Sequence, residues 1–365
     1  MKNNNFFKSQ YGVALAIISA ISAPATAMAE VDFTGKTIEW VIPFAETGGA
    51  ARWANFFAPL LSEELPGKPL VVVKYMPGAG STKGANWFQQ QAHEDGTLIF
   101  GSSGSTQFPY LLGDPRVRYE YKDWNPVMAS GTGGVVYLSS EFADDFDGSA
   151  NGLKDRFFVF GSQGASALDL VPLLAWKMLG MNVEPVFGIK SRGDARLMFE
   201  RGEANIDYQT TATYRTSSVD YVNAGIAVPM MTLGALDKDG NIGRDPTFPD
   251  IPSFKEVCEA TDGCEASGPE WEAWKAFFIA GYPTQNIAFL PQDTPQDIKD
   301  VYSDAFSNLT KRADFPEISL NQVGDYPVFT GRDAFEAVEQ AINVDANAKK
   351  MILDWLEGSY GFTFN

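Results

Sequence analysis

The chain has 365 residues, of which 46 are acidic and 28 are basic, so its formal charge at neutral pH is −18. A strongly acidic protein repels nucleic acids and anionic lipid surfaces, and we expect neither as a partner. The length is sufficient for a large core, either in one big domain or in two lobes.

The N-terminus has the three parts of a secretory signal peptide. Lys2 and Lys8 precede an apolar run over 11–23, and the small residues Ala27 and Ala29 follow it. A helix needs about 20 apolar residues to span a bilayer, and this run is shorter. A membrane anchor would also be followed by a stop-transfer pattern, which we do not find here. We therefore expect cleavage after Ala29, which leaves a mature chain that begins at Glu30.

Short apolar strands then alternate with amphipathic helices, a pattern typical of an α/β fold with a largely parallel sheet. Strands are predicted over 37–44, 70–75, 97–101, 135–138, 157–161, 183–187, 205–209 and 228–233. Helices are predicted over 51–65, 82–91, 168–179, 194–201, 295–311, 331–347 and 349–356. The order of strand, small-residue turn and helix occurs in both halves of the chain, which indicates two lobes.

Four turns between a strand end and a helix start are rich in small residues: 46–50, 77–81, 101–105 and 161–166. A helix N-terminus leaves about four N–H groups unpaired, and small residues let an anion approach them closely. Glycine and serine are also ordinary turn and N-cap residues, so one such turn indicates little. Four of them in two half-chains predict an anionic ligand between facing lobes, because ligands of open α/β sheets lie beyond the strand ends.

Two arginines near these turns are candidates for contact with a carboxylate. Arg52 follows the first Gly-Gly turn, and Arg192 precedes the helix predicted over 194–201. A guanidinium group can donate two parallel hydrogen bonds to a carboxylate. Each arginine taken singly is more typical of a solvated surface residue.

The sequence offers little support for a metal site or for catalysis. Cys258 and Cys264 lie close together in a chain that we expect to be exported, which favours a local disulfide over a metal site. The segment 237–241 alternates acidic and amide residues like a calcium loop, but it lacks the glycine and the final acid of an EF-hand, which favours an exposed turn. His93, the only histidine, is expected to be solvated at a helix end. We expect no metal, no cofactor and no enzymatic activity.

Six segments, taken in order, resemble the Bug-type periplasmic receptors of tripartite tricarboxylate transporters. They are IEWVIPFAETGGA, VVVKYMPGAGSTKGANWF, HEDGTLIFGSSGS, FGSQGASALDL, VEPVFGIKSRGDARLMFERGEANID and FPDIPSFKEV. The resemblance covers most of the mature chain. It implies a periplasmic receptor with the two-lobe, flytrap-type (type II-like) fold, which captures a dicarboxylate, a tricarboxylate or an aromatic carboxylate between its lobes.

The resemblance also implies which residues contact the ligand. In the first lobe they are Phe44, Gly48, Gly49, Gly78, Ala79, Gly80, Ser81 and Ser103. In the second lobe they are Ser162, Gln163, Gly164, Ala165, Ser166, Arg192 and Gly193. Where the family has Thr-Asp after its Gly-Gly-Ala, this chain has Ala51-Arg52, so we expect Arg52 to favour a second carboxylate over an amino acid.

From this resemblance we expect a signal peptide over 1–29 and a first lobe over 30–130. A second lobe is expected over 131–270, followed over 271–365 by a return to the first lobe and by C-terminal helices. The expected partners are a small carboxylated ligand and the integral membrane subunits of the transporter, and the receptor itself is expected to be a monomer. The alternatives are an acidic amino acid receptor, a sensory receptor for a histidine kinase, and a secreted hydrolase that uses Ser103 or Ser166.

Overall fold

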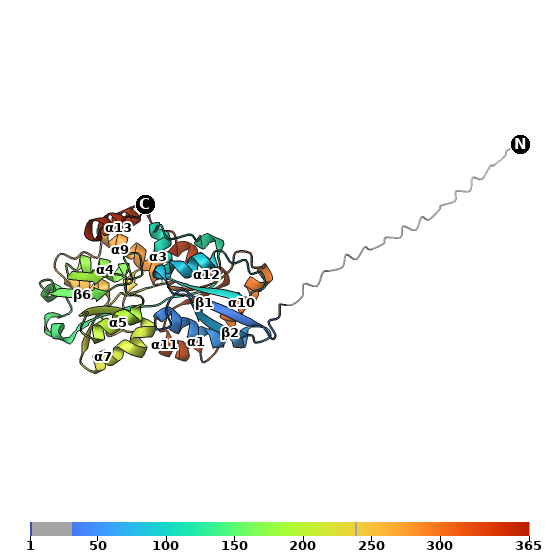
Figure 1. The fold of residues 1–365 in the computed structure, drawn as a ribbon, viewed down its shortest axis with the longest axis horizontal. Coiled ribbons are helices and arrows are strands. Elements are labelled where there is room, and N and C mark those ends of the chain that lie inside the picture. Colours follow the sequence, from blue (N-terminus) through green and yellow to red (C-terminus); the bar gives the residue numbers. More distant parts are fainter. Residues whose placement is uncertain (2–30, 238, 365) are drawn as a thin grey trace. The chain divides into compact units, whose positions relative to one another are not determined.

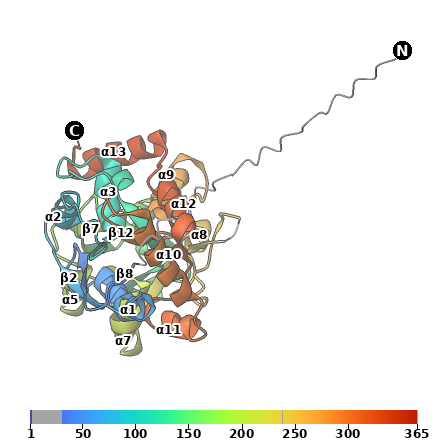
Figure 2. The same ribbon diagram turned by 90° about the vertical axis from the view of Figure 1, so that its right-hand side faces the viewer.

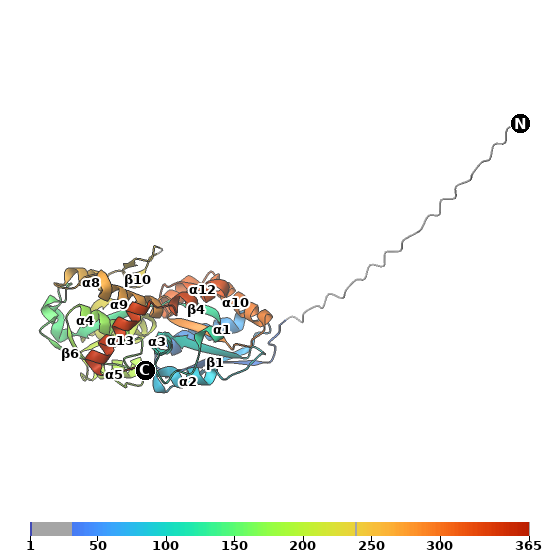
Figure 3. The same cartoon turned by 90° about the horizontal axis from the view of Figure 1, so that it is seen from above.

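The computed structural model describes Met1 and the residues 31–237 and 239–364. The predicted signal peptide and its cleavage site lie outside these described residues. Within the described part, strands and helices alternate as predicted, and they build two groups, one around a six-stranded sheet and one around a three-stranded sheet with a separate pair of strands. The prediction of a largely parallel sheet is wrong, because most of the described strand pairings are antiparallel. Figures 1 and 3 show the two groups side by side, with β6 (Phe157–Gly161), α4 (Leu170–Met178) and α5 (Arg192–Glu200) in one group and β1 (Thr37–Ile42) and α10 (Gln296–Thr310) in the other.

The first group, called the first lobe from here on, is built on a six-stranded sheet in the order β13-β4-β12-β3-β1-β2. Strand β1 is parallel to β2 and β3, whereas β12 is antiparallel to both β3 and β4. The strands are β1 (Thr37–Ile42), β2 (Leu70–Tyr75), β3 (Leu98–Ser103), β4 (Asn125–Ser130), β12 (Asn286–Leu290) and β13 (Val328–Thr330). The helices are α1 (Gly49–Glu64), α2 (Thr82–Phe88), α10 (Gln296–Thr310), α11 (Phe315–Gln322) and α12 (Gly331–Ala341).

Aromatic side chains cover both faces of this sheet because successive residues of a strand point to opposite sides. On one face, Trp40 of β1 packs edge-on against Trp53 of α1, with ring centroids 5.0 Å apart, and against Phe306 of α10 at 6.1 Å. On the other face, Phe100 of β3 stacks on Phe88 of α2 at 4.7 Å. Figure 2 views this lobe with α1, α10 and α12 toward the reader.

The second group, called the second lobe, contains a three-stranded antiparallel sheet in the order β8-β5-β9 and the parallel pair of β6 and β7. The strands are β5 (Gly134–Ser139), β6 (Phe157–Gly161), β7 (Asn182–Val186), β8 (Ile206–Thr210) and β9 (Ala227–Thr232), with a small hairpin of β10 (Ala235–Leu236) and β11 (Ile242–Gly243). The helices are α4 (Leu170–Met178), α5 (Arg192–Glu200), α6 (Thr211–Thr213), α7 (Val219–Asn223) and α8 (Phe254–Ala260).

Three further helices pack into the core of the second lobe: α3 (Gly104–Leu112), α9 (Gly268–Gly281) and α13 (Ala346–Tyr360). Phe108 of α3 meets Phe277 of α9 edge-on at 5.3 Å, and Trp274 of α9 packs on Phe254 of α8 at 4.5 Å. The predicted return to the first lobe at residue 271 therefore falls inside α9. The chain re-enters the six-stranded sheet only at β12, because the aromatic face of α9 is buried in the second lobe.

The two cysteines form the predicted disulfide. Cys258 lies in α8, and its Cα atom is 5.1 Å from that of Cys264, to which it is bonded. Of the predicted exposed turn over 237–241, the structure describes Asp237 and the residues 239–241, which lie between β10 and β11, and there the Asp237 carboxylate accepts the N–H groups of Asp239 and Asn241. None of the helices in the described part of the chain combines the length and apolar character needed to cross a bilayer.

Candidate functional site

Two adjoining cavities lie between the lobes at the ends of the strands. The first, called the inner cavity, has a volume of about 40 Å³. The second, called the outer cavity, has a volume of about 550 Å³ and shares Phe44, Ala45 and Gln163 with the inner one. The inner cavity is lined by Phe44, Ala45, Gly48, Gly49, Ala50, Ser103, Ser105, Gln163, Leu168, Ser191, Arg192, Tyr208, Thr210 and Gln285. The outer cavity is lined by Pro43, Phe44, Ala45, Pro77, Gly78, Ala79, Gly80, Ser81, Arg116, Gln163, Gly188, Ile189, Lys190 and Asp194.

All four small-residue turns predicted from the sequence contribute to these two cavities. The turns 46–50, 101–105 and 161–166 line the inner cavity, and 77–81 lines the outer one. Of the predicted contact residues, Phe44, Gly48, Gly49, Ser103, Gln163 and Arg192 lie on the inner cavity, and Gly78, Ala79, Gly80 and Ser81 lie on the outer cavity. The turns are therefore brought together at one junction, as the argument from helix N-termini requires.

The start of helix α1 presents free amide groups to the inner cavity. Gly48 is its N-cap residue and, having no side chain, provides no capping hydrogen bond. The N–H of Arg52 makes the first bond of the helix, to the carbonyl of Gly48 at 3.2 Å. The N–H groups of Gly49, Ala50 and Ala51 precede that bond, so they have no acceptor within the helix. A 16-residue helix adds the positive end of its dipole at the same place.

Two glycines allow the lobes to approach each other beside this cavity. A Cβ atom on Gly49 would lie 2.4 Å from Thr210 Oγ1, and a Cβ on Gly193 would lie 2.8 Å from Thr47 Oγ1. The hydroxyl oxygens of Thr47 and Ser191 are 3.5 Å apart across the same junction. A larger residue at either glycine would therefore require Thr210 or Thr47 to shift before the lobes could reach the observed closure.

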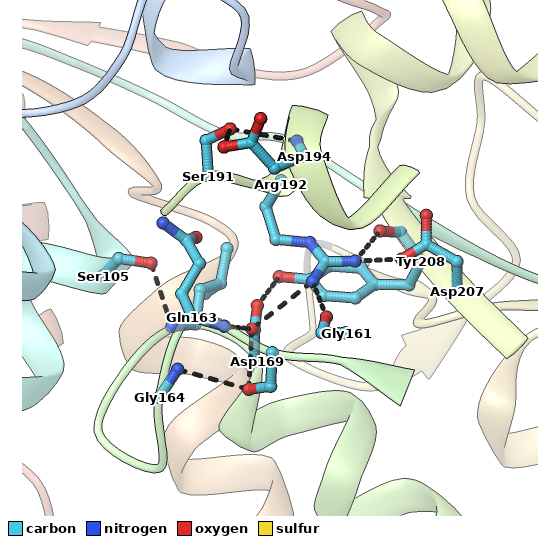
Figure 4. A network of polar contacts seen from close by, with 12 residues as sticks. Ser105, Gly161, Gln163, Gly164, Asp169, Ser191, Arg192, Asp194, Asp207 and Tyr208 are labelled. Carbon is cyan, nitrogen blue, oxygen red and sulfur yellow. Dashed lines mark hydrogen bonds and ion pairs between the residues drawn. The ribbon is translucent and has the colours of Figure 1, made fainter. Parts of the chain in front are cut away.

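The second-lobe turn, in contrast, bonds its polar groups internally. The Asp169 carboxylate accepts the Ser162 hydroxyl at 2.9 Å and the Gln163 N–H at 2.6 Å (Figure 4). Ser162 is fully buried, and its oxygen also accepts the Gly164 N–H at 3.3 Å. The Ser162 hydroxyl is therefore part of the network that shapes the turn, and its predicted contact with a ligand stays a prediction.

Arg192 lines the inner cavity, but its two terminal nitrogens are engaged within the second lobe. NH1 donates to the Gly161 carbonyl at 2.5 Å, and NH2 donates to the Tyr208 carbonyl at 2.8 Å and forms an ion pair with Asp207 (Figure 4). Asp169 is a second ionic partner at 3.4 Å. In this geometry Arg192 holds the cavity wall together, and its predicted contact with a carboxylate stays a prediction.

The two carboxylates beside Arg192 determine its protonation state. Burial lowers the pKa of Arg192, but Asp169 and Asp207 outweigh that effect, so the pKa lies above its ordinary value and the guanidinium stays charged. Burial raises the pKa of Asp207, against the opposing influence of Arg192 and of the Tyr137 hydroxyl, which donates to Asp207 at 2.5 Å. The ring of Tyr208 lies under the guanidinium, with 4.6 Å between the Arg192 Cζ atom and the ring centroid.

The remaining second-lobe residues predicted to bind lie off the cavity linings. The Ser166 hydroxyl donates to Asp114 at 3.1 Å and accepts a hydrogen bond from Arg116 at 3.3 Å, so it connects the two lobes instead. Ala165 is buried in the second-lobe core. Gly164 and Gly193 support the turn and the close approach of the lobes, respectively.

Several cavity residues were not predicted. Ser105 accepts the Leu168 N–H at 3.0 Å, Gln285 accepts the Gly104 N–H at 3.2 Å, and Thr210 faces Gly49. In the outer cavity, Arg116 donates to the Ala79 carbonyl at 3.4 Å and brings a positive charge beside the glycine turn. The one sequence signal for Arg116 is its position in the segment that follows the small-residue turn 101–105. Many surface arginines have such a position, so this signal does not single out Arg116.

Arg52 lies in neither cavity. It lines a separate groove of about 710 Å³ between α1 and the second lobe, and it donates from NH2 to the Ser217 hydroxyl at 2.8 Å. His93 lines neither the two cavities nor this groove, so the site offers no histidine as a base for Ser103. Ser166 also lies away from these linings. Within the described ranges, no group of three or more His, Cys, Asp or Glu side chains is arranged to hold a metal ion.

No family model matches the chain, and no curated protein matches it either. Solved structures do match over most of its length. The periplasmic binding protein BugD is 18% identical with a TM-score of 0.63, covering 88% of this chain and 95% of that one. The MatC protein of Rhodopseudomonas palustris with bound malate is 15% identical with a TM-score of 0.61, covering 87% and 98%. An R. palustris protein with adipate is 16% identical with a TM-score of 0.65, covering 85% and 95%.

These similarities show that the chain has the two-lobe α/β fold of periplasmic binding proteins, which confirms the fold predicted from its sequence. BugD carries the name of the receptors whose motifs the sequence resembles. BugD is named as a periplasmic binding protein, and the two R. palustris proteins were solved with the small dicarboxylates malate and adipate.

Proposed function

We propose that this protein is a Bug-type periplasmic receptor, which binds a small carboxylate between its lobes and delivers it to the membrane subunits of a tripartite tricarboxylate transporter. The single observation that carries this proposal is the uncapped N-terminus of α1, whose free amides at Gly49 and Ala50 open into the inner cavity. Amides aimed at one point in a site closed to water bind a carboxylate strongly.

The volumes of the two cavities support a binding mode in which different parts of the ligand occupy the inner and the outer cavity. The inner cavity of about 40 Å³ accommodates roughly one carboxylate group. The rest of the ligand would extend past Phe44 and Gln163 into the outer cavity, where Arg116 and Lys190 line the wall. The malate and adipate bound by proteins of the same fold are ligands of this shape.

The test is a ligand screen on the mature chain. Thermal unfolding would be followed with malate, adipate, a tricarboxylate, benzoate and glutamate, and with ribose and a divalent cation as controls. A ligand at 100 times its Kd stabilises a folded protein by about 2.7 kcal/mol, so a bound carboxylate should raise the Tm clearly. Stabilisation by the sugar or the cation, with none by any carboxylate, would refute the proposal.

The same screen separates the alternatives. Glutamate stabilising more than malate or adipate would indicate an acidic amino acid receptor, for which Asp194 in the outer cavity offers a carboxylate to an ammonium group. Delivery would be tested by uptake of the best ligand into vesicles that contain the membrane subunits. Binding without stimulated uptake would favour a sensory role.

A further inference from the structure

We propose that the groove lined by Arg52 and Arg196 is a second anion site, which binds an oxyanion separate from the ligand of the inner cavity. The groove has a volume of about 710 Å³ and shares no lining residue with the inner or outer cavity. It is lined by Glu46, Thr47, Arg52, Asn55, Phe56, Pro59, Leu60, Arg196, Thr216 and Gln322.

The groove joins a cation from each lobe. Arg52 belongs to α1 of the first lobe, and Arg196 belongs to α5 of the second lobe. Closure of the lobes therefore brings two positive charges to the same groove. The two guanidinium groups repel each other, and an anion bound between them would attract both.

The positive charge of the groove is poorly neutralised by the protein itself. Arg52 makes no ion pair with any residue that the structure describes, and its partner Ser217 is neutral. The Nε atoms of Arg52 and Arg196 are both buried without a hydrogen-bond partner. Both arginines are partly buried, and withdrawing a cation from water without a counter-charge is unfavourable, although this chain carries 18 more acidic than basic residues that could have supplied one.

The acids near the groove are weak partners for these cations. Glu200 lies 3.9 Å from Arg196 NH1, which donates instead to the Tyr221 hydroxyl at 2.5 Å. Glu46 lines the groove but is exposed to solvent. Burial lowers the pKa of Arg52, and the charge of Arg196 lowers it further, as expected for two cations without an intervening anion.

The chemistry of the site selects an oxyanion. Guanidinium groups bind carboxylate, sulfate and phosphate oxygens through paired N–H donors, and such charge-assisted hydrogen bonds are stronger than neutral ones. Sulfate and phosphate present three or more oxygens, so they can contact both arginines at once. Acetate presents only two and should bind more weakly.

The experiment is titration calorimetry of the mature chain with sodium sulfate, sodium phosphate and sodium acetate at constant ionic strength. We expect sulfate or phosphate to bind once per chain and more tightly than acetate. Arg52→Gln and Arg196→Gln should each weaken that binding at least tenfold, and Arg52→Lys, which keeps the charge but loses the fork, should weaken it less. Glu46→Gln should tighten it by about two- to fivefold, because a competing surface charge is removed.

Arg201→Gln is the matched control, since Arg201 follows the same helix α5 but pairs with Glu203 at 2.7 Å outside the groove. It should leave the titration unchanged. The proposal is overturned if the wild-type chain shows no saturable sulfate or phosphate binding. It is equally overturned if Arg201→Gln weakens binding as much as Arg52→Gln. Sulfate or phosphate bound in the inner cavity would titrate equally in the wild type, Arg52→Gln and Arg196→Gln, and that result would also overturn the proposal while leaving the receptor function standing.

Discussion

The two walls of the inner cavity are built on opposite principles. The first-lobe wall is an uncapped helix start, where Gly48 offers no side chain and the next three N–H groups have no acceptor within the helix. The second-lobe wall is a closed polar network, in which Asp169 and Arg192 use their hydrogen-bonding groups on the turn itself. The first wall is therefore suited to hold a ligand, and the second to supply a rigid surface against which the ligand is closed.

This contrast separates two roles that look identical in the sequence. Both walls come from glycine- and serine-rich turns, but Ser103 lies on the inner cavity whereas the Ser162 hydroxyl is bonded to Asp169. Substitutions on the first wall should therefore change affinity at constant stability. Those on the second wall should change stability first.

The largest effect is expected from Arg192→Met, which would leave Asp169 and Asp207 buried without a cation. Breaking a buried ion pair typically costs about 3–5 kcal/mol, so the free energy of unfolding should fall by that order. Urea unfolding followed by tryptophan fluorescence measures it. Arg201→Met, at an exposed pair, should stay within about 0.5 kcal/mol of the wild type. A loss of ligand affinity without a loss of stability would reverse the role assigned to Arg192.

A smaller effect is expected from Gly49→Ala on the first wall. The new Cβ would lie 2.4 Å from Thr210 Oγ1, and overpacking of this kind costs about 1–3 kcal/mol. The cost arises only when the lobes close, so carboxylate affinity should fall about tenfold while the unfolding free energy without ligand is retained. Calorimetry with the best carboxylate of the screen measures the change.

Adding Thr210→Ala should restore most of the affinity lost in Gly49→Ala, because it removes the clashing hydroxyl. A double variant no tighter than the single one would show that closure against Thr210 is not the cause.

Ser103→Ala and Ser162→Ala compare the two walls most directly. Loss of one hydrogen bond costs about 0.5–1.5 kcal/mol, so Ser103→Ala should weaken carboxylate binding about two- to tenfold with little change in stability. Ser162→Ala should lower the unfolding free energy by a similar amount and leave the affinity nearly unchanged. Calorimetry measures the carboxylate affinity of each variant, and urea unfolding measures its unfolding free energy. Equal effects of the two variants on affinity would contradict the different roles assigned to the two walls.

The smallest effect concerns Asp245, a buried carboxylate that, unlike Asp169 and Asp207, forms no ion pair within the described residues. Burial raises its pKa above the ordinary 3.8, although the Tyr326 hydroxyl donates to it at 2.7 Å. Its protonated form therefore stabilises the fold below pH 3.8, and this contribution is lost as the pH rises through the folded-state pKa. The stability of the wild type relative to Asp245→Asn should fall as the pH increases from 4 to 7. Parallel stability curves would contradict the assignment.

The parts of the fold that were predicted correctly have strong local signals. Helix α1 has apolar residues at helical spacing and ends before Pro66-Gly67, and the strands β1, β2 and β3 are bounded by turn residues. Strands β4 and β12 were not predicted, although both lie inside the six-stranded sheet. The last four residues of β4 and all five of β12 are buried, so neither strand shows the alternation by which a half-buried strand is recognised.

The candidate site divides in the same way. Patterns of neighbouring residues sufficed for the small-residue turns, for the helix starts beside them and for the disulfide, because each depends on groups within a few residues of one another. The engagement of Arg192 with Asp207, the placing of Arg52 in a separate groove, and the presence of Ser105, Thr210 and Gln285 at the inner cavity depend on how the lobes pack. Such contacts join residues up to 181 positions apart, as between Gly104 and Gln285, and only the folded chain brings their side chains within bonding distance.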